Sequence, residues 1–244
     1  MDKLHIGTSG WIYPSWKGKF YPNDLAQSSY LEFYAQHFNS VELNYSFYRL
    51  PKPSNYENWA LQIPKRFVFA IKLSRFISHV KRLNNVESTW QTFIENSSPL
   101  SSHRGPILVQ LPENFHLNID RLHQFLEMAY SNTPKLKLVC EFRHPTWFVD
   151  EVYNLLSDYG AALCIGDSPK YPRHDVVTAK FVYYRFHGRS KLFASNYSKA
   201  ILQQEAIKMR KLLKKGLDIY AFFNNDAKGH AIKNAQTLLD LLKT

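Results

Sequence analysis

Eight short apolar runs, each with the length of a buried β-strand, alternate with segments of helical spacing along this chain. Such alternation predicts a parallel sheet covered by crossover helices. Eight repeats within 244 residues favour a closed (β/α)8 barrel, the TIM-barrel architecture, over an open doubly wound sheet. Because no linker, low-complexity stretch or internal repeat interrupts the pattern, the sequence predicts one α/β domain spanning residues 1–244.

The expected elements follow one another with short connections. The expected strands are 4–6, 41–44, 67–72, 107–110, 136–141, 161–165, 181–186 and 218–223. The expected helices are 28–38, a stretch running through Trp59 to Pro64, 87–95, 119–130, 148–159, 196–214 and 231–242. The turn at 7–11 lacks the GxGxxG pattern, so dinucleotide binding is not indicated.

Polar residues stand where these apolar runs end, and the carboxyl ends of parallel strands meet at one mouth of a barrel. Because side chains alternate between the two faces of a strand, residues two apart point the same way. Apolar alternates such as Cys140 and Phe142 then face the helix layer, where burial stabilises them. The residues expected in the mouth on this ground are Glu42, Asn44, Lys72, Gln110, Glu141, Arg143, Asp167, Arg185, His187 and Asn224.

The same residues have a structural interpretation. Glu141 and Arg143, two apart on one strand face, can simply pair, and a charge-balanced ring can be a self-satisfying network above the core. His187 can be hydrogen-bonded scaffolding, and His144 can cap the segment ahead of Pro145.

Charge and cysteine content limit the class of protein. The chain has 31 Lys and Arg against 20 Asp and Glu, a net charge of +11, which permits nucleic acid, anionic metabolites or an acidic partner without choosing among them. Cys140 and Cys164 lack CxxC spacing, which predicts buried reduced thiols. With neither a secretion signal nor a run of roughly 18 apolar residues, the sequence predicts a cytoplasmic protein without a membrane span.

Ordered motifs at nearly every strand end carry a family resemblance. They are GTSGW at 7–11, VELN at 41–44, QLP at 110–112, EFRH at 141–144, RFHG at 185–188 and FNN at 223–225. With these motifs the whole chain resembles the DUF72 family, also called YecE-like proteins. The resemblance implies a TIM barrel, and it supplies no reaction, substrate, cofactor or proven catalytic residue.

Motif and parity, meaning which of the two faces of its strand a residue's position assigns it to, together select the candidate site. The candidates for chemistry are Glu42, Glu141, Asp167 and His187. The candidates for binding substrate are Asn44, Lys72, Gln110, Arg143, His144, Arg185 and Asn224.

Three functions fit these candidates. The leading hypothesis is an enzyme acting on a phosphorylated or otherwise anionic small molecule, with Lys72, Arg143 and Arg185 neutralising the anion and Glu141 or His187 moving a proton.

The second hypothesis is a metal-dependent phosphodiesterase or nuclease in which Glu42, Glu141, Asp167 and His187 supply the ligands, although three cations in the mouth would repel a metal cluster. The third is a non-catalytic nucleic-acid or protein binder that uses the basic segment at 65–82, which has six cations and no acid. A glycosidase is disfavoured, since Glu42 and Glu141 come from the second and fifth strands, on opposite sides of the barrel. The sequence does not predict an oligomeric state.

Overall fold

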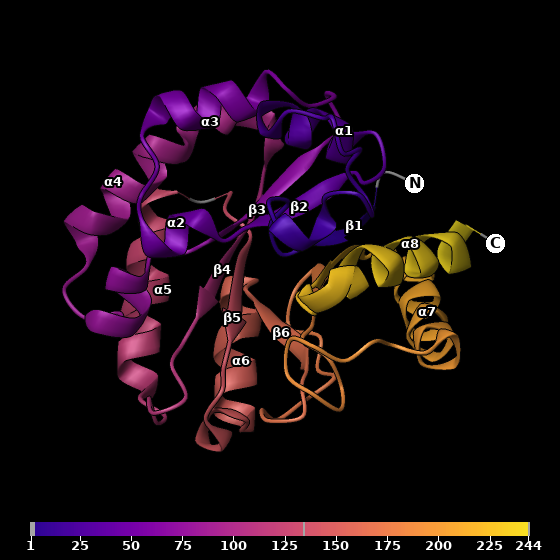
Figure 1. Cartoon of the computed structure of the whole chain (residues 1–244). Coiled ribbons are helices and arrows are strands. Elements are labelled where there is room, and N and C mark those ends of the chain that lie inside the picture. The colour runs from indigo at the N-terminus through magenta and orange to yellow at the C-terminus, as the bar shows by residue number, and fades with distance from the viewer. Residues whose placement is uncertain (1–2, 134, 244) are drawn as a thin grey trace.

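The computed structural model describes residues 3–133 and 135–243, and these residues form the predicted eight-stranded parallel barrel (Figure 1). The strands are β1 (Leu4–Thr8), β2 (Ser40–Leu43), β3 (Val68–Lys72), β4 (Arg104–Gln110), β5 (Leu138–Glu141), β6 (Ala162–Asp167), β7 (Phe181–Phe186) and β8 (Asp218–Phe223). Each strand pairs in parallel with its neighbours in the order β1-β8-β7-β6-β5-β4-β3-β2. The carboxyl ends of all eight strands therefore open on the same face.

The helices surround this barrel. They are α1 (Tyr30–Ala35), α2 (Tyr45–Tyr48), α3 (Pro53–Ala60), α4 (Glu87–Ser97), α5 (Ile119–Asn132), α6 (Asp150–Tyr159), α7 (Lys199–Lys214) and α8 (His230–Lys243). Neighbouring helices pack in pairs, and α8 packs on both β1 and β8. The described connection from β6 to β7, residues 168–180, contains no helix. None of the helices in the described part of the chain is long and apolar enough to cross a bilayer.

Local sequence explains where several helices begin and end. The side chains of Asn118 and Ser198 accept hydrogen bonds from backbone N–H groups in the first turns of α5 and α7. Gly160 ends α6 in the left-handed conformation, at φ 65°. The helix expected through Trp59 to Pro64 instead runs over Pro53–Ala60, because a proline fits the first turn of a helix and the residue before Pro64 is biased away from helical geometry.

Two apolar layers hold the barrel together. Alternate strand residues face the helices. The other alternates fill the barrel interior with Ala70, Leu108, Val139, Ala162, Cys164, Phe181, Tyr183, Tyr220 and Phe222. Cys140 faces the helix layer and Cys164 the interior, and both are free and buried, as predicted. Burial raises the pKa of the Cys140 thiol to about 12, so this thiol is inert.

The barrel closes between β1 and β2 largely through side chains. The Tyr34 hydroxyl accepts from the Thr8 N–H at 2.8 Å and donates to the Ser40 carbonyl at 3.1 Å. The Asn39 side chain accepts from the Ile6 N–H and donates to the Leu4 carbonyl. At the mouth, the Gly10 N–H donates to the Glu42 carbonyl at 2.8 Å. This line of contacts between β1 and β2, here called the β1–β2 seam, therefore continues to the carboxyl end of β2.

Candidate functional site

Arg185 occupies the centre of the barrel mouth. It projects inward from β7, two residues beyond the interior residue Tyr183, and it is only 1% exposed. Its guanidinium donates to both carboxylate oxygens of Glu42, at 2.8 Å from Nε and 2.6 Å from Nη2. On its other side, Nη1 donates to Glu141 at 2.5 Å. Two buried carboxylates from β2 and β5 are therefore joined through one cation.

Glu42 is completely buried, and every contact that surrounds its carboxylate stabilises the charged form. Ser9 and Tyr183 each donate a hydroxyl hydrogen bond to it at 2.8 Å. Burial alone would raise the pKa of Glu42, but the charges of Arg185 and Lys72 and the hydrogen bonds from Arg185 and Ser9 together outweigh it, and the pKa is lowered. Glu42 is thus a fixed anion.

Glu141 is the second fixed anion, and it connects Arg185 to two further residues of the mouth. Its Oε1 lies 3.3 Å from Arg143 Nε and 3.4 Å from His187 Nε2. Against the effect of burial, Arg185 and Arg143 hold the pKa of Glu141 well below its usual range. Burial and the Arg185 charge lower the pKa of His187, whose other ring nitrogen lies 3.2 Å from the Asn224 amide.

Arg143 lies above this layer and faces open space. Its Nη2 donates to Gln110 at 3.0 Å and its Nη1 to the Tyr171 hydroxyl at 3.3 Å, while the guanidinium carbon lies 4.4 Å from the Tyr171 ring centroid. These contacts orient the guanidinium, and each terminal nitrogen keeps a second N–H for a ligand.

Lys72 projects inward from the carboxyl end of β3 without an anionic partner. Its Nζ lies 4.0 Å from the Phe47 ring centroid, and the side chain makes no hydrogen bond or ion pair with any described residue. Burial, together with the nearby charge of Arg185, lowers the pKa of Lys72 to about 7. An amine of this pKa can bind an anion or exchange a proton near neutrality.

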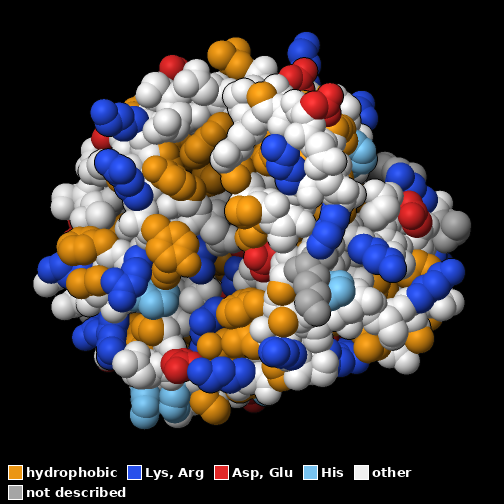
Figure 2. Space-filling view, viewed as in Figure 1, with side chains coloured by type: hydrophobic (Ala, Val, Ile, Leu, Met, Phe, Trp, Pro, Cys, Tyr) orange, Lys and Arg blue, Asp and Glu red, His pale blue; other side chains and the backbone are white. Residues whose placement is uncertain are grey.

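These side chains surround a cavity of about 690 Å³. It is lined by Tyr13, Asn44, Phe47, Tyr48, Lys72, Arg75, His79, Gln110, Arg143, Arg185, Phe193, Asn224 and Asp226. Lys72, Arg75 and Arg143 face the open space, whereas Glu42 and Glu141 lie in the layer below. In Figure 2, Lys and Arg side chains are spread around a central hollow and acidic side chains are sparse.

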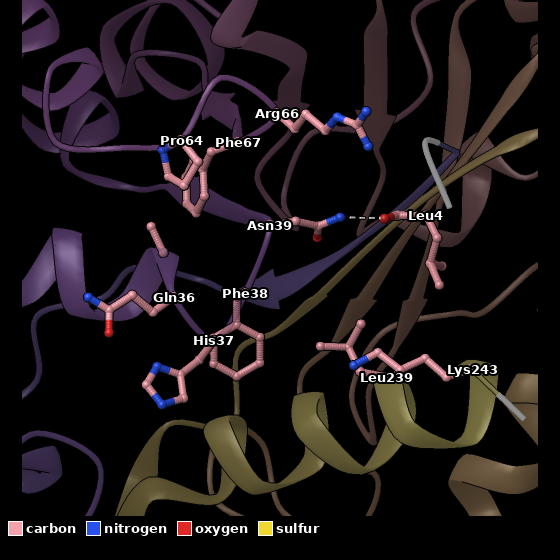
Figure 3. Close-up of a pocket in the computed structure, with 11 residues that line it drawn as sticks. Leu4, Gln36, His37, Phe38, Asn39, Pro64, Arg66, Phe67, Leu239 and Lys243 are labelled. Carbon is pink, nitrogen blue, oxygen red and sulfur yellow. Dashed lines mark hydrogen bonds between the residues drawn. The ribbon is translucent and has the colours of Figure 1, made fainter.

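A smaller cavity of about 260 Å³ lies near the other end of the barrel, between α1 and α8 (Figure 3). Its wall includes Leu4 and Asn39, which share a hydrogen bond of the β1–β2 seam, and the apolar side chains of Phe38, Phe67 and Leu239. The amino-terminal face of such barrels serves stability, and these residues do not present a converging set of catalytic groups.

The comparisons with known proteins agree with this geometry. A family model described as "Protein of unknown function DUF72" matches residues 5–244. The chain belongs to the DUF72 family. The crystal structure of a DUF72 family protein from Thermotoga maritima MSB8 is 28% identical, superposes with a TM-score of 0.89, and the match covers 99% of both chains.

Two curated relatives have similar descriptions. The UPF0759 protein YunF of Bacillus subtilis is 24% identical over 270 residues, covering 98% of this chain and 94% of YunF. The UPF0759 protein YecE of Escherichia coli K12 is 34% identical over 146 residues, covering 59% of this chain and 50% of YecE. The expected family and fold are confirmed, and the description of the DUF72 family supplies no activity.

Most of the predicted mouth residues of this DUF72 protein do come together. Asn44, Lys72, Gln110, Arg143, Arg185 and Asn224 line the cavity. Glu42, Glu141 and His187 contact Arg185 and are absent from the described lining, so these candidates for chemistry support the cavity floor instead of lining it.

Asp167 and His144 lie elsewhere. The interior residues of β6 are Ala162 and Cys164, so Asp167 has the opposite parity and faces the helix layer, where Arg173 binds it at 2.8 Å. The parity assigned to Asp167 was therefore wrong. His144 follows the inward-facing Arg143 and points outward, where it stacks on His116 and accepts a hydrogen bond from the Thr146 N–H.

Several residues of the site were not expected from sequence. Tyr13, Arg75, His79, Phe193 and Asp226 reach the cavity from loops, where strand parity gives no guidance. Tyr183 could have been found, since it lies two residues before Arg185 on the same strand.

Proposed function

We propose that this DUF72 protein is an enzyme that acts on a small anionic molecule, with a phosphate-bearing substrate the best match, bound in the cavity at the barrel mouth. One observation carries the proposal: among the described residues, Lys72, Arg75, Arg143 and Arg185 line the cavity with a single carboxyl group, Asp226, whereas Glu42 and Glu141 lie below and are bound to Arg185. A phosphate group entering the cavity meets Arg143, Arg75 and Lys72 before any acid of that lower layer.

The competing interpretation, that acids neutralise every cation of the mouth, has little support. Glu42 is bound to Arg185, and Glu141 is shared by Arg185 and Arg143. Asp167 faces away. Lys72 and Arg75 have no ion pair among the described residues, so a positive field remains for a ligand. Guanidinium groups on rigid elements also bind phosphate with little loss of ordering entropy.

The metal-dependent alternative has weaker support. Its proposed ligands Glu42 and Glu141 already accept hydrogen bonds from Arg185, and a metal would have to displace that cation. No group of three His, Cys, Asp or Glu side chains suited to a metal occurs in the part of the chain that the structure describes. Arg185 also fills the space between the two carboxylates, which argues against a glycosidase.

Calorimetric titration tests the anion-binding part of the proposal. We expect inorganic phosphate and a panel of small phosphate esters to bind the protein at low salt. Arg143→Met should weaken this binding about tenfold or more, since a hydrogen bond to a charged group contributes about 1.5–3 kcal/mol. Lys211→Met, on the exposed surface of α7, is the control of equal charge change.

Equal phosphate affinity in wild type and Arg143→Met would remove the basis for this function. If the protein instead binds long nucleic acid in a salt-dependent way and ignores small phosphates, the basic surface serves nucleic acid. The exposed aromatic Tyr48 beside the cavity would then be a candidate for stacking on a base.

A further inference from the structure

Lys72 is the one amine in the described lining of the mouth cavity, and its position suits a nucleophile better than an anion ligand. Its backbone is fixed because Ser46 Oγ donates to its carbonyl at 2.6 Å, and the Leu73 N–H donates to the Leu108 carbonyl at 2.9 Å. The side chain is 9% exposed and lies over the Phe47 ring. Within residues 3–133 and 135–243, no carboxylate holds the amine in a salt bridge, so its nitrogen can reach a ligand.

The surroundings of Lys72 favour the unprotonated amine. Burial opposes a positive charge on Lys72 most strongly, followed by the charge of Arg185 and, more weakly, that of Arg143, and the carboxylates of Glu141 and Glu42 only partly offset these effects. His79 contacts the Phe47 ring edge to face, and burial, together with the charge of Lys72, lowers the pKa of its imidazole to about 4, so it adds no charge near neutrality. At pH 7 Lys72 therefore has a substantial share of free amine, against fewer than about one in a thousand for an exposed lysine.

A desolvated lysine next to other cations is the arrangement in which an amine attacks a carbonyl carbon. The cavity also offers Arg143 and Arg75 to hold an anionic group, and it is lined by Asp226, a carboxyl group whose pKa is raised by burial. These features place a nucleophile, an anion site and a carboxyl group around one space.

We propose that Lys72 forms a Schiff base with the carbonyl carbon of a small anionic aldehyde or ketone. The Lys72 nitrogen forms a bond to the carbonyl carbon, a proton moves from nitrogen to oxygen, and the resulting hydroxyl leaves as water with one added proton. The product is a protonated imine, which withdraws electrons from the bonds next to the former carbonyl carbon. The anionic character of the substrate rests on the function proposed above, whereas imine formation itself does not.

Reductive trapping tests this proposal on the full-length protein. Dihydroxyacetone phosphate serves as an anionic carbonyl probe and glycolaldehyde as an uncharged one, each with sodium cyanoborohydride at pH 7, followed by peptide mass spectrometry. We expect one reduced adduct per chain at Lys72, forming at least about tenfold faster than at the exposed Lys65, because Lys72 has far more free amine. At pH 10 this preference should shrink.

Matched variants separate the possible outcomes. Lys72→Arg and Lys72→Met should lose the adduct, and Lys65→Gln should keep it. Labelling spread evenly over exposed lysines, or no adduct with either probe, would overturn the imine proposal while leaving phosphate binding to be judged by calorimetry. A third outcome is that glycolaldehyde is trapped at Lys72 as readily as the phosphorylated probe and that phosphate does not bind. This result would keep Lys72 as the nucleophile and reject the anionic substrate.

Discussion

Single side chains decide the character of the barrel mouth, and Arg185 decides most of it. Arg185 is a buried guanidinium between two buried carboxylates, and three ionic hydrogen bonds to Glu42 and Glu141 offset the cost of its desolvation. Arg185 can therefore contact a ligand only through the small surface it presents to the cavity. Its main effect is to hold Glu42 and Glu141 in place.

Replacing Arg185 should be costly. Arg185→Met leaves two buried carboxylates without their main partner, and breaking such a pair typically costs about 3–5 kcal/mol. Urea denaturation should show this loss in the free energy of unfolding. Arg143→Met should cost less, since Glu141 keeps Arg185. Adding Glu42→Gln and Glu141→Gln to Arg185→Met should recover part of the lost stability. A loss below about 1 kcal/mol in Arg185→Met alone would show that the ion pairs of Arg185 contribute little.

Lys72 should give stability a distinct pH dependence. Its pKa is about 7 in the folded protein against about 10.5 for an unperturbed lysine, so between these values the unfolded chain binds a proton that the folded protein has released. The stability due to Lys72 is therefore complete above about pH 10.5 and is lost as pH falls to 7. Wild type should gain stability relative to Lys72→Met as pH rises over this window. Urea denaturation from pH 6 to 10 measures this difference in the free energy of unfolding, and Lys65→Met, at an exposed position, is the control. If the free energy of unfolding of wild type and of Lys72→Met changes with pH in parallel, the lowered pKa is contradicted.

At the scale of elements, the strands account for what the sequence could predict. Parity correctly turned Glu42, Glu141 and Arg185 inward because each lies in a strand whose apolar alternates face the helices. It failed for Asp167, where the inward position next to it is Gly166, which gives no hydropathy signal. His144 belongs to the EFRH motif, but its parity is opposite to that of Arg143, and it points away from the cavity.

The loop from β6 to β7 makes ion pairs that the sequence did not predict. Its Arg173 binds Asp167 at 2.8 Å, Glu205 of α7 at 2.7 Å and Asp175 at 2.7 Å. Arg173 therefore connects the loop to strand β6 and to helix α7. Glu205 lies in the middle of a helix rich in cations and had no reason to be expected inside. Ion pairs between distant segments depend on tertiary structure, and spacing along the chain does not reveal them.

For the molecule as a whole, alternation of strands and helices was enough to predict a closed barrel, but not how it closes. Parallel ladders join seven neighbouring pairs, while β1 and β2 are joined mainly through Tyr34, Asn39 and the contact of Ser9 with Glu42. Gly7 allows the close approach, since a Cβ there would lie 1.9 Å from the Ser40 carbonyl oxygen. Because Ser9 also binds Glu42, closure and the cavity floor share one hydrogen-bond network.

Removing the Tyr34 hydroxyl should weaken this closure. Tyr34→Phe leaves the Thr8 N–H and the Ser40 carbonyl without the group that joins them, and an unsatisfied buried polar group costs about 1–3 kcal/mol. Tyr56→Phe is a matched control, because the Tyr56 hydroxyl is buried without a hydrogen-bond partner among the described residues, and its removal should leave stability unchanged or slightly higher. Urea denaturation measures both, and hydrogen exchange should show faster opening of the Thr8 amide in Tyr34→Phe alone. If the two variants are equally stable, the side-chain seam does not hold the barrel closed, and the neighbouring ladders do so without it.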